Sequence, residues 1–186
     1  FYKILFYLPA ICTSTIVGTV FSKIFETNRG YLNVILRALH LDFLCQQWLA
    51  TPKTALACLL FVNIWQWTGY SMLMYYTNML NIPQDLYESA TIDGAGSFKQ
   101  FIYITFPLLR GTHITLIILD ILGALKFFDL SYVLTDGGPA HATETFSTYI
   151  YTKSFSTFQQ GQASTIVVFM FLIAMVLTVI QLKIYY

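Results

Sequence analysis

Long apolar stretches alternate with short polar segments along the chain. Four apolar stretches cover residues 4–25, 54–80, 113–134 and 163–182. A helix needs roughly 20 apolar residues to cross a bilayer, because its backbone polar groups must all be satisfied within the helix. The pattern therefore predicts an all-α, polytopic transmembrane helical bundle with about four spans. Pro9 lies in the first stretch, and we expect a kink there because proline removes a backbone donor.

Two of the polar segments predict local structure of their own. Residues 26–53 contain an amphipathic part near 31–41, for which we expect a helix along the membrane surface. Residues 136–139, Asp-Gly-Gly-Pro, predict a turn. Thr143 is then placed to cap a short helix rich in aromatic residues, and such residues suit the bilayer interface.

Composition strengthens this interpretation and excludes other classes. The chain is 56% hydrophobic and 10% charged, which leaves too little charge to cover a soluble globule of 186 residues. A net charge of +1 without a basic cluster excludes a nucleic-acid interface. The three cysteines and three histidines are scattered, so neither a disulfide framework nor a metal site is expected. The loop Lys and Arg residues divide equally between the two sides, so charge does not set the orientation.

The segment between the second and third apolar stretches carries the strongest helix signals. Pro83 predicts a helix start, and Asp85 and Glu88 suit the positive end of that helix. Residues 93–96, Asp-Gly-Ala-Gly, should break the helix, because glycine tolerates left-handed backbone.

A second short helix should follow this break. Ser97 and Gln100 read as a capping box that starts the helix, and Pro107 marks its end. The segment is thus predicted to fold as helix, turn, helix. The pattern alone fits either a connector at the membrane interface or an element that docks into a partner.

The spacing in this segment closely resembles the signature of permease subunits of binding-protein-dependent ABC importers, which is E-A-A, three residues, G, nine residues, I-x-L-P. Ser89 and Phe106 replace an alanine and the leucine of the signature. The surrounding sequence, including the Gly-Gly-Pro turn, is similar to the carbohydrate-uptake branch of that family, specifically its maltose-transporter-like first permease subunit. The positions that match are Glu88, Ala90, Asp93, Gly94, Ile104 and Pro107.

The resemblance implies a type I ABC importer permease core. Residues 1–186 would form one truncated transmembrane domain, the last four of six spans of a longer permease in a bacterial plasma (inner) membrane. Residues 81–112 would be a cytosolic coupling loop that seats in a groove of a separate ATP-hydrolysing subunit, which would bind ATP and Mg. A second permease subunit and an extracytoplasmic solute-binding protein are further implied partners. The chain itself would be no enzyme and would hold no cofactor.

The implied function is translocation of a sugar or oligosaccharide across the membrane. One alternative is a permease for a non-sugar solute such as glycerol 3-phosphate, for which Lys126 is the available cation. Another is a secondary transporter driven by an ion gradient through Asp120. A membrane-embedded enzyme would need a convergent catalytic set, which we do not find in the sequence.

Polar side chains within the spans indicate where a solute could pass, since such residues are costly in lipid. Asn63, Trp67 and Tyr70 share one helical face, with Gln66 close by. An amide beside an aromatic ring suits a sugar, although helix–helix contact or an interfacial aromatic belt would explain the same residues.

The third span offers a second candidate face. Asp120, Gly123 and Phe127 share it by the same spacing, and Lys126 and Asp129 are placed for an ion pair. Structural pairing, solute contact and proton coupling all remain open for Asp120.

Overall fold

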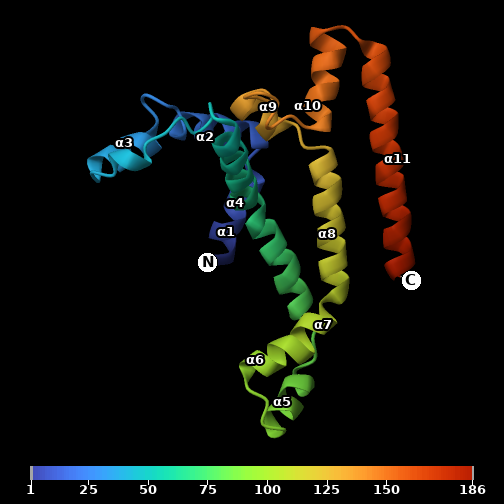
Figure 1. The fold of residues 1–186 in the computed structure, drawn as a ribbon. Coiled ribbons are helices and arrows are strands. Elements are labelled where there is room, and N and C mark those ends of the chain that lie inside the picture. The colour runs from blue at the N-terminus through green and yellow to red at the C-terminus, as the bar shows by residue number, and fades with distance from the viewer. Residues whose placement is uncertain (1, 186) are drawn as a thin grey trace.

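The computed structural model describes residues 2–185, which contain helices and turns and no strand (Figure 1). The all-α prediction is therefore confirmed. Besides the α-helices, there is a 3-10 turn at Asp42–Leu44, and π-helical turns occur at Phe101–Thr105 and Thr152–Ser156. The α-helices are α1 Tyr2–Ile11, α2 Ser14–Ile24, α3 Tyr31–Ala38, α4 Pro52–Met79, α5 Gln84–Ile92, α6 Ser97–Gln100, α7 Phe106–Leu108, α8 Arg110–Leu125, α9 Asp129–Thr135, α10 Phe146–Tyr151 and α11 Gln160–Tyr185.

Two of the four predicted spans are single continuous helices, α4 and α11. Within the described residues, α11 is the one helix that is long and apolar enough by itself to cross a membrane, and the count rises to three if two bent helix pairs are each one span. Helix α4 is not among them, because polar residues such as Asn63 and Gln66 interrupt its apolar sequence. Almost all of α11 is unburied within this chain, which leaves its apolar surface for lipid or another subunit.

The first predicted span, residues 4–25, is a bent pair of helices and not one continuous helix, and the bend lies close to Pro9, where a kink was expected. Helices α1 and α2 meet at 95°, and the break follows Pro9 by three residues, at Cys12 and Thr13. Gln66 of α4 supplies the physical reason, because its Nε2 donates a hydrogen bond to the Cys12 carbonyl oxygen at 3.0 Å. The break thus has a buried partner for a backbone group that helix continuation would otherwise satisfy.

The third predicted span, residues 113–134, is wrong over its last part. Helix α8 ends at Leu125, and α9 begins separately at Asp129. Hydroxyl groups beyond the break satisfy the carbonyl oxygens around it. Thr145 Oγ1 donates to the Phe127 carbonyl at 2.6 Å, and Ser147 Oγ donates to the Leu125 carbonyl at 3.4 Å.

The apolar core lies where α2, α4 and α9 meet. Helix α2 approaches α9 closely at Gly18, where an added Cβ would lie 3.0 Å from Val133 Cγ1. Helix α1 packs still more tightly on α4 at Gly69, where an added Cβ would overlap the Phe6 carbonyl. The buried side chains of this core are Val17, Phe25, Cys58, Val62, Leu130 and Leu134.

The predicted amphipathic helix between the first two stretches is present as α3. Its buried Asn33 organises the rest of the connection, since Nδ2 donates to the Thr27 and Gln46 carbonyl oxygens and Oδ1 accepts from Trp48 Nε1 at 2.8 Å. These bonds hold the long 26–53 segment as one folded unit.

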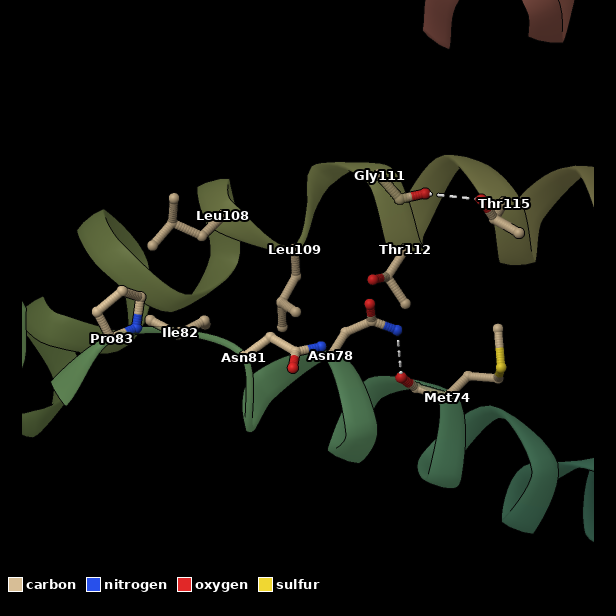
Figure 2. A pocket seen from close by; sticks show the side chains of 10 residues that line it. All are labelled: Met74, Asn78, Asn81, Ile82, Pro83, Leu108, Leu109, Gly111, Thr112 and Thr115. Atoms are coloured by element: carbon tan, nitrogen blue, oxygen red, sulfur yellow. Dashed lines mark hydrogen bonds between the residues drawn. The ribbon is translucent and has the colours of Figure 1, made fainter.

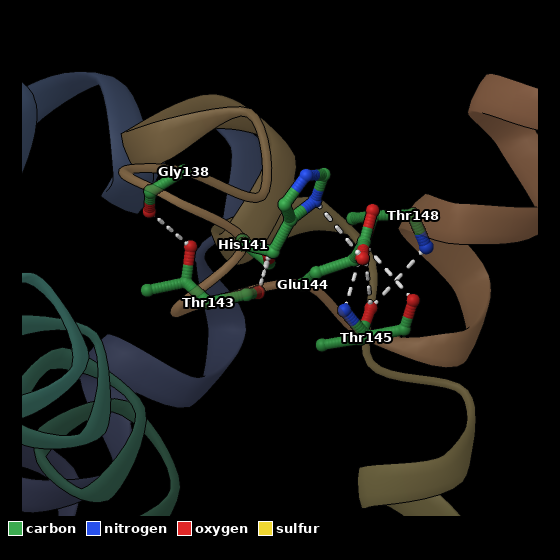
Figure 3. A network of polar contacts seen from close by, with 7 residues as sticks. Gly138, His141, Thr143, Glu144, Thr145 and Thr148 are labelled. Atoms are coloured by element: carbon green, nitrogen blue, oxygen red, sulfur yellow. Dashed lines mark hydrogen bonds and ion pairs between the residues drawn. The ribbon is translucent and has the colours of Figure 1, made fainter. Parts of the chain in front are cut away.

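The turn at residues 136–139 is confirmed, but the cap of the next helix is Thr145 and not Thr143. Thr145 Oγ1 accepts from the Thr148 backbone N–H, and Thr148 Oγ1 accepts from the Thr145 N–H, so the two residues form a capping box (Figure 3). Thr143 is used elsewhere, because its hydroxyl donates to the Gly138 carbonyl at 2.6 Å.

Candidate functional site

The segment 81–112 projects from one end of the molecule, beyond the ends of α4 and α8 (Figure 1). It folds as helix α5, a tight turn, and then α6 followed by the π-helical turn and α7. The helix–turn–helix prediction is confirmed. We call residues 84–108 the hairpin.

The start of α5 differs slightly from the prediction. Pro83 is the residue before the helix and not its first residue, and Asp85 lies in the first turn. Glu88 and Asp93 are exposed, Ala90 is half-buried, and neither carboxylate forms an ion pair with the residues that the structure describes.

Gly94 turns the chain out of α5 with φ of +76°. Its N–H donates to the Thr91 carbonyl at 3.0 Å, and the Ala95 N–H reaches back to the Ala90 carbonyl at 2.9 Å. The backbone of any residue other than glycine is strained at this φ. No atom of the described chain lies within 4 Å of the position that a Cβ would occupy. The backbone angle, and not crowding by this chain, therefore favours glycine here.

The predicted capping box of Ser97 and Gln100 is wrong. Gly96 precedes α6 without a side-chain cap, and the Gln100 amide points back to α5 instead. Gln100 Nε2 donates to Thr91 Oγ1 at 2.9 Å and to the Ala95 carbonyl at 3.0 Å. These bonds satisfy the end of α5 and tie the two helices of the hairpin together.

A second bond between hydroxyl groups closes the other end of the hairpin. Tyr87 of α5 and Thr105 share a hydrogen bond of 2.8 Å, and Thr105 is buried. With contacts at both ends, the hairpin is one rigid unit, which sequence spacing alone did not indicate.

Several large apolar side chains of the hairpin are exposed among polar and charged residues. Ile92 is 87% exposed, Phe98 75% and Tyr103 76%. Ile104 is half-buried, and Pro107 is exposed on α7. Large apolar side chains that stay exposed outside the long apolar helices are candidates for contact with another protein.

The hairpin joins α8 through a bend of 64° between residues 97–108 and 110–125. Pro107 lies just before this bend, inside α7, and does not itself end the helix. His113, for which the sequence pattern predicts no role, connects three elements here. Its Nδ1 shares a hydrogen bond of 2.8 Å with the Tyr75 hydroxyl of α4, and its Nε2 lies 3.1 Å from the Phe106 carbonyl.

A hollow of about 400 Å³ separates the ends of α4 and α8 at the base of the hairpin (Figure 2). Two of the polar side chains that line it bond within their own helices: Asn78 Nδ2 donates to the Met74 carbonyl, and Thr115 Oγ1 donates to the Gly111 carbonyl. The His113 bond to Tyr75 joins the two helices beside this hollow.

The candidate solute-path residues of α4 do share a face. Trp67 and Tyr70 are in edge contact, with ring centroids 6.2 Å apart, and Asn63 is half-buried. Gln66 is on the buried side of the same helix, at the break between α1 and α2.

The second candidate face is only partly formed. Asp120 and Gly123 are exposed on α8, but Phe127 lies beyond the end of the helix and packs against the core. The predicted ion pair of Lys126 and Asp129 is not formed among the described residues, because the helix that would align them ends at Leu125. Within the described residues, no group of three or more His, Cys, Asp and Glu side chains could hold a metal ion.

The apolar helices are typical of an integral membrane protein. Residues 1–185 match the family described as "Binding-protein-dependent transport system inner membrane component", and the chain belongs to this family. Membership in this family makes it a membrane protein.

Relatives with curated descriptions include the probable ABC transporter permease protein YurN of Bacillus subtilis, which is 35% identical over 98% of this chain and 63% of its own length. The trehalose/maltose transport system permease protein MalF of Thermococcus litoralis is 33% identical over 95% of this chain and 59% of its own length. The chain thus spans roughly three fifths of these relatives.

A solved structure shows the same fold. It is described as a bacterial ABC transporter involved in the import of the acidic polysaccharide alginate. The TM-score is 0.88 at 24% identity, over 98% of this chain and 64% of that chain.

Proposed function

We propose that this chain is the membrane-spanning subunit of an ATP-driven ABC importer that translocates a sugar or oligosaccharide. The observation that carries the proposal is the rigid hairpin with Glu88, Ala90, Asp93, Gly94, Ile104 and Pro107 at the signature spacing. The carbohydrate class is supported by relatives whose printed names refer to trehalose and maltose, arabinooligosaccharides and sulfoquinovosyl glycerol.

The hairpin would couple transport to ATP hydrolysis in a separate subunit. Its exposed apolar surface and the carboxylates of Glu88 and Asp93 would seat in that subunit, which would bind ATP and Mg. Because Gln100 and the Tyr87–Thr105 bond hold the hairpin rigid, displacement of the docked surface would move its base as well. Binding can shift a conformational equilibrium only if its contacts differ between the two states.

Docking of the hairpin into an ATP-hydrolysing subunit would also set the positions of the other parts of the assembly. The hairpin would lie in the cytosol of a bacterium, with α4, α8 and α11 in the plasma (inner) membrane and a second permease subunit alongside. An extracytoplasmic binding protein would deliver the solute at the opposite end. Within the membrane, the solute would pass Asn63, Trp67 and Tyr70 of α4, together with Asp120 and Gly123 of α8.

Reconstitution of the complete complex in proteoliposomes tests this function. The measurement is ATPase stimulation, and uptake, with binding protein loaded from a panel of neutral oligosaccharides, alginate oligomers and glycerol 3-phosphate. We expect stimulation by one or more sugars. A flat response to every sugar would contradict the carbohydrate assignment, and uptake that persists after the ATPase is disabled, with an ion gradient intact, would favour a secondary transporter.

A further inference from the structure

A second hollow, of about 320 Å³, lies between α9 and α10. These helices are at the end of the molecule opposite the hairpin (Figure 1). If the hairpin is cytosolic, the hollow opens on the side from which solute arrives. Its lining combines aromatic rings, carboxylates and hydroxyl groups, and the residues that matter for the argument are Tyr132, Asp136, His141, Glu144, Tyr151 and Thr152.

Two tyrosines form the aromatic side of the hollow. The ring centroids of Tyr132 and Tyr151 are 5.0 Å apart at an interplanar angle of 67°, so the two rings are in edge-to-face contact, and the Phe155 ring, in the next helical turn, lies 5.2 Å from that of Tyr151. Phe128 supports both rings, stacked on Tyr132 at 5.1 Å and 5.3 Å from Tyr151. Tyrosine offers an apolar ring face together with a polar hydroxyl, which suits a ligand that has both C–H faces and hydroxyl groups.

Carboxylates provide the polar side. Asp136 and Glu144 are acceptor-only groups when ionised, so they favour ligands with hydroxyl donors. His141 Nδ1 lies 3.2 Å from Glu144 Oε2, with the histidine side chain 82% exposed and the glutamate 26% exposed. Two carboxylates against one histidine make this an unfavourable place for an acidic sugar, because like charges repel.

The loop that carries these groups is fixed before any ligand binds (Figure 3). Ser131 Oγ donates to the Thr143 carbonyl, and Thr143 Oγ1 donates to the Gly138 carbonyl, each at 2.6 Å. Ser131 and Thr143 are buried, so these bonds are shielded from water. A lining held in place in this way loses little conformational entropy when a ligand binds.

We propose that this hollow is an outer binding site for a neutral sugar unit, separate from the path through the membrane. The class of ligand assigned to this site, a sugar, rests on the proposed function. A sugar ring would stack on Tyr132 and Tyr151, and its hydroxyl groups would donate to Asp136 and Glu144. The site would hold the leading unit of a solute on its way into the membrane, and it would discriminate against uronic acids.

Local protection from chemical labelling tests the site directly. Ser156 lines the hollow and is exposed, so Ser156→Cys in the complete complex in nanodiscs, without binding protein, can be labelled with a maleimide. Protein without this substitution gives the background from the three natural cysteines. The probes are maltotriose, cellotriose and arabinotriose, with triguluronate as the acidic counterpart. We expect at least one neutral trisaccharide to slow labelling and triguluronate to have no effect.

Tyr151→Leu in the same background should raise the sugar concentration needed for protection by about tenfold, because it removes the stacking face. Tyr149→Leu is the matched control, since Tyr149 lies on the same helix and does not line the hollow. Protection unaffected by Tyr151→Leu, preference for triguluronate, or no protection by any sugar would each overturn the site.

The ATPase stimulation assay distinguishes failure of the outer site from failure of the proposed function. Stimulation by a sugar-loaded binding protein, without any protection of the Ser156→Cys variant from labelling, would leave the importer intact and remove the outer site. The absence of stimulation by every sugar would remove both.

Discussion

His113 is the residue through which the hairpin meets both helices that carry it. His113→Leu keeps an apolar contact with Phe106, whose ring lies 4.6 Å away, but removes the bonds to Tyr75 and to the Phe106 carbonyl. We expect the ratio of sugar transported to ATP hydrolysed to fall several-fold, with a stability loss of only about 1–2 kcal/mol. Parallel transport and ATPase assays in proteoliposomes measure the ratio.

Tyr75→Phe serves as the graded comparison, because it removes one of the two bonds and keeps the ring. Its effect on the ratio should be smaller and of the same sign. If both variants transport and hydrolyse with the unaltered ratio, His113 is only a packing residue.

Gln66 shows how one side chain can decide the course of a helix. Gln66→Leu keeps most of the volume, removes the donor to the Cys12 carbonyl, and also removes Oε1, a buried oxygen without a hydrogen-bond partner among the described residues. We expect Gln66→Leu to cost about 1–2 kcal/mol, and Gln66→Ala about 3 kcal/mol because it adds a cavity. Unfolding of the purified subunit in detergent measures both. Equal losses would show that the hydrogen bond, and not the packing, dominates.

Gly94 tests whether the shape of the turn matters to coupling. Gly94→Leu forces a branched side chain into left-handed backbone at φ +76°, and we expect it to abolish coupled transport while membrane insertion stays normal. Asn tolerates this backbone region, so Gly94→Asn should keep the turn. Uptake at the normal rate by the leucine variant would refute the prediction. Loss in both variants would indicate that a partner touches this position.

At the scale of elements, the sequence predicted best where the signals are local. The hairpin follows from Pro83 and Gly94, whose effects on the backbone act within a few residues. The break after Leu125 was missed, and the break at Cys12 was expected only as a kink at Pro9, because the groups that stabilise both breaks come from elsewhere. Gln66 is 54 residues from Cys12. Hydropathy describes a chain segment and carries no information about such distant partners.

The same reasoning explains the residues that were assigned to the wrong role. Gln100 fits the capping-box spacing, but its amide finds three acceptors at the end of α5, which a local spacing rule does not include. Phe127 has the helical spacing that would place it on one face with Asp120 and Gly123. Helix α8 ends at Leu125, however, so Phe127 lies outside that helix. The candidate face of α4 was placed correctly because α4 is continuous, whereas its part in solute passage remains a prediction.

The break between α8 and α9 gives a prediction about an element boundary. Thr145→Val removes the donor to the Phe127 carbonyl and the cap of α10 together. We expect a loss of about 2 kcal/mol or more in the stability of this end, because both a cap and a buried bond are lost. Hydrogen exchange of residues 127–148 should rise, while the hairpin at the other end keeps its protection. Uniform exchange across the chain would contradict a local effect.

At the scale of the whole molecule, the two ends are built differently. The end with α9 and α10 carries a polar loop fixed by buried hydroxyl groups, whereas the hairpin end carries two short helices joined by a turn at Gly94 (Figure 1). Between them, α11 packs beside α8 but leaves most of its apolar surface unburied by the described chain. This arrangement fits a subunit that depends on neighbours along its length and receives different partners at its two ends.

The hairpin keeps its shape through Tyr87, Gln100 and Thr105, whereas Ile92, Phe98 and Tyr103 face outward and support no part of it. Outward residues can therefore change freely without unfolding the hairpin. The consequence is evolutionary: one scaffold can acquire a different partner through the exchange of a few surface side chains, and specificity can diverge while the architecture stays constant.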